Sequence, residues 1–280
     1  MSTSSLSGIL TSNFLNLLRS GAFDESKPIS IMSEYKWSQV VLLAHYHGVT
    51  PFLAKGIEHY HFDDNLNIPK EQIEQVKEHL KTSPSQGLSD LYVASRLHLH
   101  NKEMNKQLQH LVSQEYSDPE RSYETLQLLA ILICNVESIL AGRSSLRGLI
   151  DLGRYLRQEG DKVDFVKLER WLGQTRMMKM ACLQGTLLAE GFGFTKEELP
   201  FVSKFQPNSR RWLLRALMLG HFANHPTSTG TNMHNGFALS SPGTAWRTIR
   251  HALAYRRLAP GETISTICHG IMRGLAEIDE

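Results

Sequence analysis

One segment restricts the fold of this chain more than any other, because it is apolar around nearly the whole circumference of a helix. It runs TLQLLAILICNVESIL over residues 125–140. A helix of this kind has to be buried on all sides, so other elements must surround it. The remaining apolar residues recur at helical spacing, and no run alternates with period two among β-branched residues. The sequence therefore predicts an all-α fold, a multi-helix, bundle-like array with little or no β-sheet.

Helical spacing, proline near helix starts and glycine after helix ends divide the chain into separate helices. Gly48, for example, is predicted to end one helix and Thr50-Pro51 to begin the next. The stretch 226–243 is rich in Gly, Ser, Thr and Asn and is predicted to be a mobile loop. We expect an N-terminal helical region over 1–112 and a C-terminal one over 118–280, packed as one globular unit. Helices are expected at 7–18, 37–44, 52–60, 70–80, 88–112, 125–140, 147–157, 165–171, 177–190, 210–221, 244–258 and 264–275.

The segment HLVSQEYSDPERSYETLQLL, residues 110–129, joins two of these helices across a short polar turn. The first is predicted to end near Val112 and the second to begin near Tyr123. Two helices joined by so short a loop are expected to form an antiparallel hairpin. The apolar residues expected to pack across that hairpin are Leu108, Leu111 and Val112 against Leu126, Leu129 and Ala130.

Composition sets few limits on function. The 280-residue chain is 41% hydrophobic, enough for a core, and its formal net charge of +2 does not favour a strongly charged partner. Its three cysteines include no CxxC pair, which is typical of a reduced cytoplasm. The N-terminus lacks the basic and apolar regions of a signal peptide, and no apolar run approaches the roughly 20 residues of a membrane helix. We expect a soluble cytoplasmic protein with no membrane partner.

Histidines and carboxylates are the first candidates for catalysis or metal binding. There are thirteen histidines, but only His221 and His225 have the four-residue spacing that lets two helical side chains share a metal. Pro226 follows directly and no HExxH glutamate lies between them, so exposed or capping histidines are the favoured interpretation. The sequence contains no D-x-D pair and no GxGxxG, GxxxxGKS/T or GxSxG motif. We predict no catalytic residue, metal ligand or cofactor, although a catalytic set assembled from distant helices stays open.

Three charged residues, Arg147, Asp151 and Arg154, share one face of a predicted helix at spacings of four and three. They are interpreted first as an ion pair that stabilises the helix where it packs. The alternative is a basic surface that positions a ligand phosphate.

Charge is distributed unevenly near the C-terminus. Between Gln206 and Gly274 there are eight arginines, no lysine and a single acid, Glu262. One interpretation is a basic face neutralised by acidic helices such as EQIEQVKEHL, with Glu71, Glu74 and Glu78. The other is an anionic partner, although nucleic acid is disfavoured because no interleaved aromatics or known binding motif accompany the arginines. The predicted helical stripe consists of Arg247, Arg250 and Arg257. If a ligand site exists, we expect it to include Arg250, Arg256 or Arg257, with His221 or His225 beside it and the loop 226–243 as its lid.

Several segments together resemble a bacterial family of uncharacterised nucleotidyltransferases. They are SEYKWSQVVLLAHYHGVTPFLAKGI, NIPKEQIEQVKEHL, LHLHNKEMNKQLQHLV, SLRGLIDLGRYLRQEGDKVDFVKLERWL, LLAEGFGFTKEELPF and LMLGHFANH, in the family's order. In that family a catalytic core of strands and helices with a KG motif and a D-x-D metal-binding pair lies between the third and fourth of these segments. Here about ten residues stand in its place, and Lys55-Gly56 lies in the N-terminal region. The first segment matches at Trp37, Leu43, Ala44, His47, Gly48, Val49, Pro51 and Leu53.

The resemblance implies a degenerate, non-catalytic helical relative of these enzymes, acting as a binding or scaffolding module. Its partner would be an unknown protein or a small anionic ligand. The alternative is a nucleotidyltransferase-type enzyme component that needs a partner chain's catalytic core or uses a new site on the helices. A third possibility is a remnant without selected activity, although capped, periodic helices indicate that the chain still folds.

Overall fold

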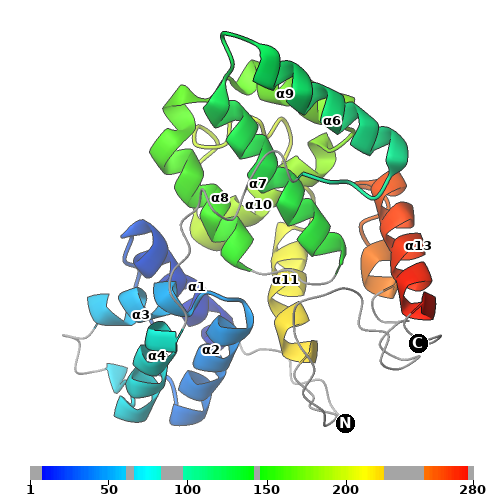
Figure 1. The fold of residues 1–280 in the computed structure, drawn as a ribbon. Helices are drawn as coiled ribbons and strands as arrows, with labels where there is room; N and C mark the ends of the chain where they lie inside the picture. Colours follow the sequence, from blue (N-terminus) through cyan, green and yellow to red (C-terminus); the bar gives the residue numbers. More distant parts are fainter. Residues whose placement is uncertain (1–7, 61–65, 83–96, 142–145, 224–248, 277–280) are drawn as a thin grey trace.

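The computed structural model describes residues 8–60, 66–82, 97–141, 146–223 and 249–276. Within these ranges the chain forms helices and connecting turns and no β-strand, which confirms the all-α prediction (Figure 1). Figure 1 shows α1 to α4 gathered in one group, α6 to α10 in a second, larger group, and α13 at the edge of the molecule. The elements are α1 (Gly8–Phe23), α2 (Glu34–Tyr46), α3 (Thr50–His59), α4 (Lys70–Thr82), α6 (Lys102–Ser117), α7 (Tyr123–Leu140), α8 (Leu146–Glu159), the short 3-10 helix η3 (Gly160–Lys162), α9 (Phe165–Gln174), α10 (Met178–Phe192), α11 (Ser209–Ala223) and α13 (Pro260–Ala276).

Helix α7 is the core of the larger group, as its all-round apolar sequence predicts. It packs against α8, α9 and α10, and Leu128, Leu129 and Ile131 are fully buried. By length and composition α7 could cross a membrane, with a mean hydropathy of 1.3 over 18 residues, but 72% of that window is buried inside the fold. Burial between helices thus accounts for most of its apolar surface.

Small residues bring α1 and α3 into close contact in the N-terminal group. A Cβ atom added at Gly21 would collide with the backbone carbonyl of Phe52, and one added at Gly56 would collide with that of Leu17. Glycine at both positions therefore lets the two helices approach backbone to backbone, because any larger side chain would push them apart.

The segment around Trp37, which carries much of the family resemblance, has a packing role in this chain. Trp37 and Val49 are fully buried, and the imidazole of His47 is fully buried as well. His47 Nε2 lies 3.3 Å from the carbonyl oxygen of Leu217, which connects the end of α2 to α11. Gly48 follows with a φ of +63°, so it ends α2 in the left-handed conformation that glycine adopts easily.

A polar network closes the junction between α6 and α7. The buried carboxylate of Glu115 accepts a hydrogen bond from the backbone N–H of Ser122 at 2.6 Å and one from Lys167 Nζ at 2.8 Å. The loop is short, as predicted, and Figure 1 shows α7 running back from the end of α6. The six apolar residues expected at this hairpin are all buried, yet α6 packs chiefly against α9, which also contacts α7. The two helices are therefore joined partly through α9.

Several helix boundaries differ from the prediction, and two of the differences interrupt an expected helix. Residues 97–101 are not helical, so the described part of the expected 88–112 helix begins at Lys102, and it continues to Ser117. Asn101 is its N-cap, with the side-chain oxygen accepting from the backbone N–H of Met104 at 3.1 Å. The expected 244–258 helix ends at Leu253 in the described residues, and turns over 254–258 lead into α13 at Pro260. The Asn101 cap therefore places the start of α6, and Pro260 occupies the first turn of α13, where its fixed φ is compatible with a helix.

Candidate functional site

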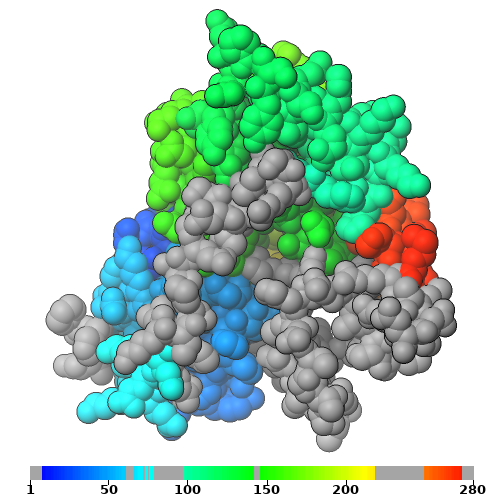
Figure 2. All heavy atoms as spheres, viewed as in Figure 1, coloured from blue at the N-terminus to red at the C-terminus, as the bar shows by residue number. Residues whose placement is uncertain are grey.

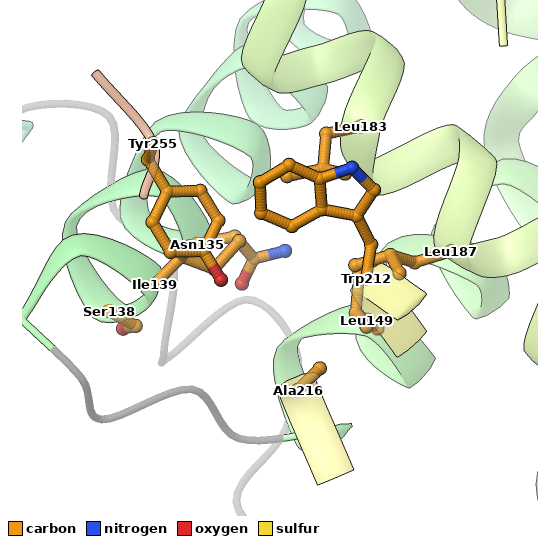
Figure 3. A pocket seen from close by; sticks show the side chains of 9 residues that line it. All are labelled: Asn135, Ser138, Ile139, Leu149, Leu183, Leu187, Trp212, Ala216 and Tyr255. Carbon is orange, nitrogen blue, oxygen red and sulfur yellow. The ribbon is translucent and has the colours of Figure 1, made fainter. Parts of the chain in front are cut away.

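A small cavity lies where α7, α8, α10 and α11 meet the turn after residue 253 (Figure 3). Its volume of about 20 Å³ is enough for about one water molecule. The rings of Trp212 and Tyr255 lie 5.1 Å apart at its wall, and the guanidinium of Arg215 stacks 5.7 Å from the Trp212 ring. The cavity is lined by Asn135, Ser138, Ile139, Leu149, Leu183, Leu187, Trp212, Ala216 and Tyr255.

The ionisable groups beside this cavity have structural partners. His251 Nε2 donates to the carbonyl oxygen of Ile139 at 2.7 Å, and burial lowers the pKa of His251 below its ordinary value. Burial also raises the pKa of Tyr255 to about 12. The imidazole therefore stays neutral at pH 7 and fastens residues 249–253 to α7. Sequence spacing gave no signal for His251, since its partner is a backbone carbonyl far away in the chain.

Arg147 and Asp151 form the ion pair that was the first interpretation of their spacing. Arg147 Nε lies 2.9 Å from both carboxylate oxygens of Asp151, which is fully buried. The guanidiniums of Arg147 and Arg154 lie 5.2 and 5.5 Å from the centroid of the Phe52 ring. The two arginines thus help to pack α8 against α3 through cation–π contacts.

The predicted histidine pair lies outside the described side chains. His221 lies on α11 but its side chain is outside the described residues, and so are His225 and the loop 226–243 that was expected to cover the site. Arg147 and Arg154 lie on α8, whereas Arg250, Arg256 and Arg257 precede α13 in the chain. Among the described residues, Arg147 and Arg154 meet at the Phe52 ring, and no described ion pair or ring contact joins them to Arg250, Arg256 or Arg257.

The three candidate arginines near the C-terminus are all exposed. None of them forms an ion pair within the part of the chain that the structure describes. Helix α4, which carries Glu71, Glu74 and Glu78, packs against α2 and α3 and lies apart from α13 in Figure 1, and no described ion pair joins these acids to the three arginines. The predicted stripe is wrong. Arg257 lies in the turn over 254–258, beyond the helix that holds Arg250, and Arg247 lies outside the described residues.

Helix α13 follows these arginines in the chain and lies at the edge of the molecule (Figure 2). Ile264, Ile271 and Met272 are 59%, 40% and 63% exposed, and Cys268 between them is exposed too. Their spacing of four, three and one places them on one side of a helix. We call Ile264, Cys268, Ile271 and Met272 the outer stripe of α13.

The opposite face of α13 is polar and buried. It presents Glu262, Thr263, Thr266 and Gly270 to the body of the protein. The hydroxyls of Thr263 and Thr266 are buried without a hydrogen-bond partner among the described residues. An amphipathic helix on a globular protein ordinarily buries its apolar face, so α13 has the reverse arrangement.

Glu262 holds the first turn of α13 against the start of α6. Its fully buried carboxylate accepts from the backbone N–H groups of His100 at 2.7 Å and Asn101 at 2.9 Å. Asn101 Nδ2 also donates to Ser265 Oγ at 3.3 Å. A carboxylate that accepts the N–H groups at a helix N-terminus is well placed electrostatically. The orientation of α13 is therefore specified by polar contacts.

Three histidine rings gather near that anchor. The ring centroids of His98 and His100 are 5.7 Å apart, and those of His100 and His269 are 4.7 Å apart. No group of three or more His, Cys, Asp or Glu side chains in the described ranges is arranged to hold a metal ion. The cluster contributes ring contacts between α13 and the segment before α6.

No protein-family model, curated protein or solved structure matches this chain. The nucleotidyltransferase resemblance therefore rests on the sequence segments alone. One feature of the described structure that packing does not explain is the outer stripe of α13, which follows the exposed arginines in the chain.

Proposed function

We propose that this chain is a non-catalytic helical relative of the nucleotidyltransferases that acts as a binding or scaffolding module. The observation that carries the proposal is the outward apolar face of α13. Three large apolar side chains and a thiol stand in water on one side of a helix, whereas most apolar groups of this size gain about 1.5–3 kcal/mol from burial. A protein partner that covers the stripe would recover part of that free energy.

The polar attachment of α13 supports the same proposal. Glu262 fastens its first turn to α6 by two hydrogen bonds, which leaves the apolar face available. In helix-in-groove recognition, an amphipathic helix places its apolar face in a hydrophobic groove of its partner. A helix attached through its polar side, as α13 is, has its apolar face free for such a contact.

Photo-crosslinking in cells that express the full chain tests the proposal. A photoreactive amino acid is placed at Ile271 and, as a matched control, at Val166, an apolar residue on α9 that is 72% exposed. We expect a discrete protein adduct from position 271 and none from position 166. The adduct partner, identified and purified, should bind the wild-type chain and lose binding to the Ile271→Asp variant.

Two results would overturn the proposal. One is an adduct pattern that is the same at positions 271 and 166, or absent at both. The other is saturable binding heat when the isolated chain is titrated with magnesium and nucleoside triphosphates, because a nucleotide site would favour the enzyme-component alternative.

A further inference from the structure

We infer that the outer stripe of α13 binds an acidic amphipathic helix of a partner protein. This inference rests on the proposed binding function and adds the chemical class of the partner. It combines the shape of the stripe, the charge that precedes it in the chain and the absence of features that other occupants would need.

The shape of the stripe fits a helix. From Ile264 to Met272 the stripe covers a little over two turns, or about 12 Å at 1.5 Å per residue. Side chains at these spacings form a ridge, and a second helix with apolar residues at the same spacings provides the matching groove. An extended peptide is held mainly by backbone hydrogen bonds to a sheet edge, and α13 offers its side chains instead.

The charge that precedes the stripe in the chain favours an acidic partner. Arg250, Arg256 and Arg257 are exposed and form no ion pair with a described residue. The acid of α13, Glu262, is buried and its oxygens accept hydrogen bonds from the backbone before α6. Arg256 and Arg257 directly precede the first turn of α13, so carboxylates on a partner helix would meet positive charge towards the N-terminal end of the stripe. Complementary charge of this kind increases the association rate and sets the orientation.

A second copy of this chain fits the same surface less well. Pairing two α13 helices would bring two sets of exposed arginines together without an exposed acid on α13 to balance them. A membrane surface fits less well too. The 17 residues of α13, PGETISTICHGIMRGLA, include no Trp, Tyr or Phe, the residues that anchor interfacial helices in lipid.

The modification rate of the Cys268 thiol can report binding in the full chain, because Cys268 lies in the stripe and is exposed. Cys182 is buried, and burial raises the pKa of the Cys134 thiol to about 11. A maleimide at pH 7 should therefore modify Cys268 first. A partner helix on the stripe would protect this thiol.

The probes are three blocked 18-residue helical peptides and one lipid preparation. The first peptide has leucines at the spacing of the stripe and glutamates elsewhere, the second has lysines in place of the glutamates, and the third has the glutamates but scrambled leucine positions. The lipid is a vesicle of phosphatidylcholine and phosphatidylserine. We expect the acidic peptide alone to slow modification of Cys268, by about tenfold at saturation.

Charge reversal tests the role of the arginines. The Arg250→Glu/Arg257→Glu variant should weaken the binding of the acidic peptide by about tenfold or more. The matched control is Arg121→Glu/Arg170→Glu, which makes the same change in net charge at two exposed arginines elsewhere and should leave binding unchanged. Circular dichroism of both variants checks that the chain still folds. An unfolded Arg250→Glu/Arg257→Glu variant would show that these arginines are structural and would overturn their role in binding.

The other outcomes also decide the inference. Three results would each overturn it. The first is equal protection of Cys268 by the lysine or scrambled peptide, and the second is protection of Cys268 by vesicles. The third is protection that grows with protein concentration together with dimer formation. If no peptide protects Cys268 while position 271 still crosslinks to an identified protein, the binding function stands and the acidic-helix inference fails. If both experiments fail, both proposals fail.

Discussion

Helices α7 and α13 are nearly equal in length, at 18 and 17 residues, and both contain many apolar residues. They differ in whether those apolar side chains are buried or exposed. Nearly all the apolar side chains of α7 are buried among α8, α9 and α10. On α13 the described apolar side chains largely face water, while a carboxylate, two threonines and a glycine face inward. The comparison shows that apolar residues at helical spacing predict a helix, but they do not predict whether its apolar face is buried in the fold or exposed.

The two helices also differ in what holds them. Dispersion and the hydrophobic effect, which are non-directional and grow with area, act on nearly the whole surface of α7. A few hydrogen bonds, such as those of Asn135 and of the Leu132 carbonyl, add to them. The described hydrogen bonds of α13 join Glu262 to the backbone N–H groups of His100 and Asn101 and join Ser265 to Asn101, and a ring contact between His269 and His100 adds to them. A helix held by few directed contacts can keep one face available for a partner.

The largest expected effect is on α7. Replacing Leu129, which is fully buried, with alanine removes apolar surface and leaves a cavity. We expect the free energy of unfolding to fall by about 2–5 kcal/mol, measured by urea denaturation. A loss below about 1 kcal/mol would show that α7 is not the centre of the core and would remove the basis of the comparison.

The next effect is at the anchor of α13. Glu262→Ala leaves two backbone N–H groups before α6 without their acceptor, and we expect a loss of about 2 kcal/mol in the free energy of unfolding. Amide hydrogen exchange should become faster at His100 and Asn101 and along α13. Glu262→Gln keeps a carbonyl acceptor and should lose less. If Glu262→Ala leaves the exchange of α13 unchanged, other contacts anchor the helix.

Much of the fold was predictable because it follows from periodicity. The apolar circumference of 125–140 predicted a buried helix, and the positions of Gly48 and Pro51 predicted the end of α2 and the start of α3. The missed boundary at Lys102 depended on an Asn101 cap inside a polar stretch that is compatible with helix. A single hydrogen bond of this kind leaves a weak signal in the sequence.

The candidate site was less predictable because its geometry is set by distant contacts. The spacing of Arg147 and Asp151 correctly predicted a local ion pair. The spacing of Arg250 and Arg257 was misleading because the helix between them ends at Leu253. The outward orientation of α13 depends on Glu262 meeting residues more than 160 positions away in the chain, and helical periodicity contains no information on that contact.

A smaller effect should follow from filling the inner face of α13 with apolar groups. Thr263→Val and Thr266→Val replace buried hydroxyls that lack a described partner with methyl groups of similar size. We expect each change to raise the free energy of unfolding by about 1 kcal/mol. Thr186→Val is the matched control, since the Thr186 hydroxyl donates to the carbonyl of Cys182 at 2.7 Å and accepts from the N–H of Gln206 at 2.9 Å. The control should be destabilised, and a loss at all three positions would show that the inner hydroxyls are satisfied.

The contact between residues 249–253 and α7 should make the free energy of unfolding depend modestly on pH. Burial, with a further contribution from Arg215, lowers the pKa of His251 in the folded state, and its hydrogen bond to Ile139 opposes that shift without reversing it. As the pH falls below about 6.5, the unfolded chain takes up a proton at this site before the folded chain does, so stability decreases until the folded pKa is reached. His251→Gln retains a donor and should give a shallower decrease in unfolding free energy between pH 7 and pH 5. An equal slope in both proteins would assign the pH dependence to other histidines.

The smallest expected effect is on the outer stripe itself. Ile271 is 40% exposed, and its substitution by serine removes an apolar group that packs incompletely in the isolated chain. We expect the free energy of unfolding to change by no more than about 0.5 kcal/mol, whereas binding of a fluorescent hydrophobic dye to the folded protein should decrease. This pattern would be the opposite of that at Leu129, where stability changes most. A loss of more than about 1.5 kcal/mol at Ile271 would mean that the side chain is covered in solution, and α13 would then resemble α7 instead of contrasting with it.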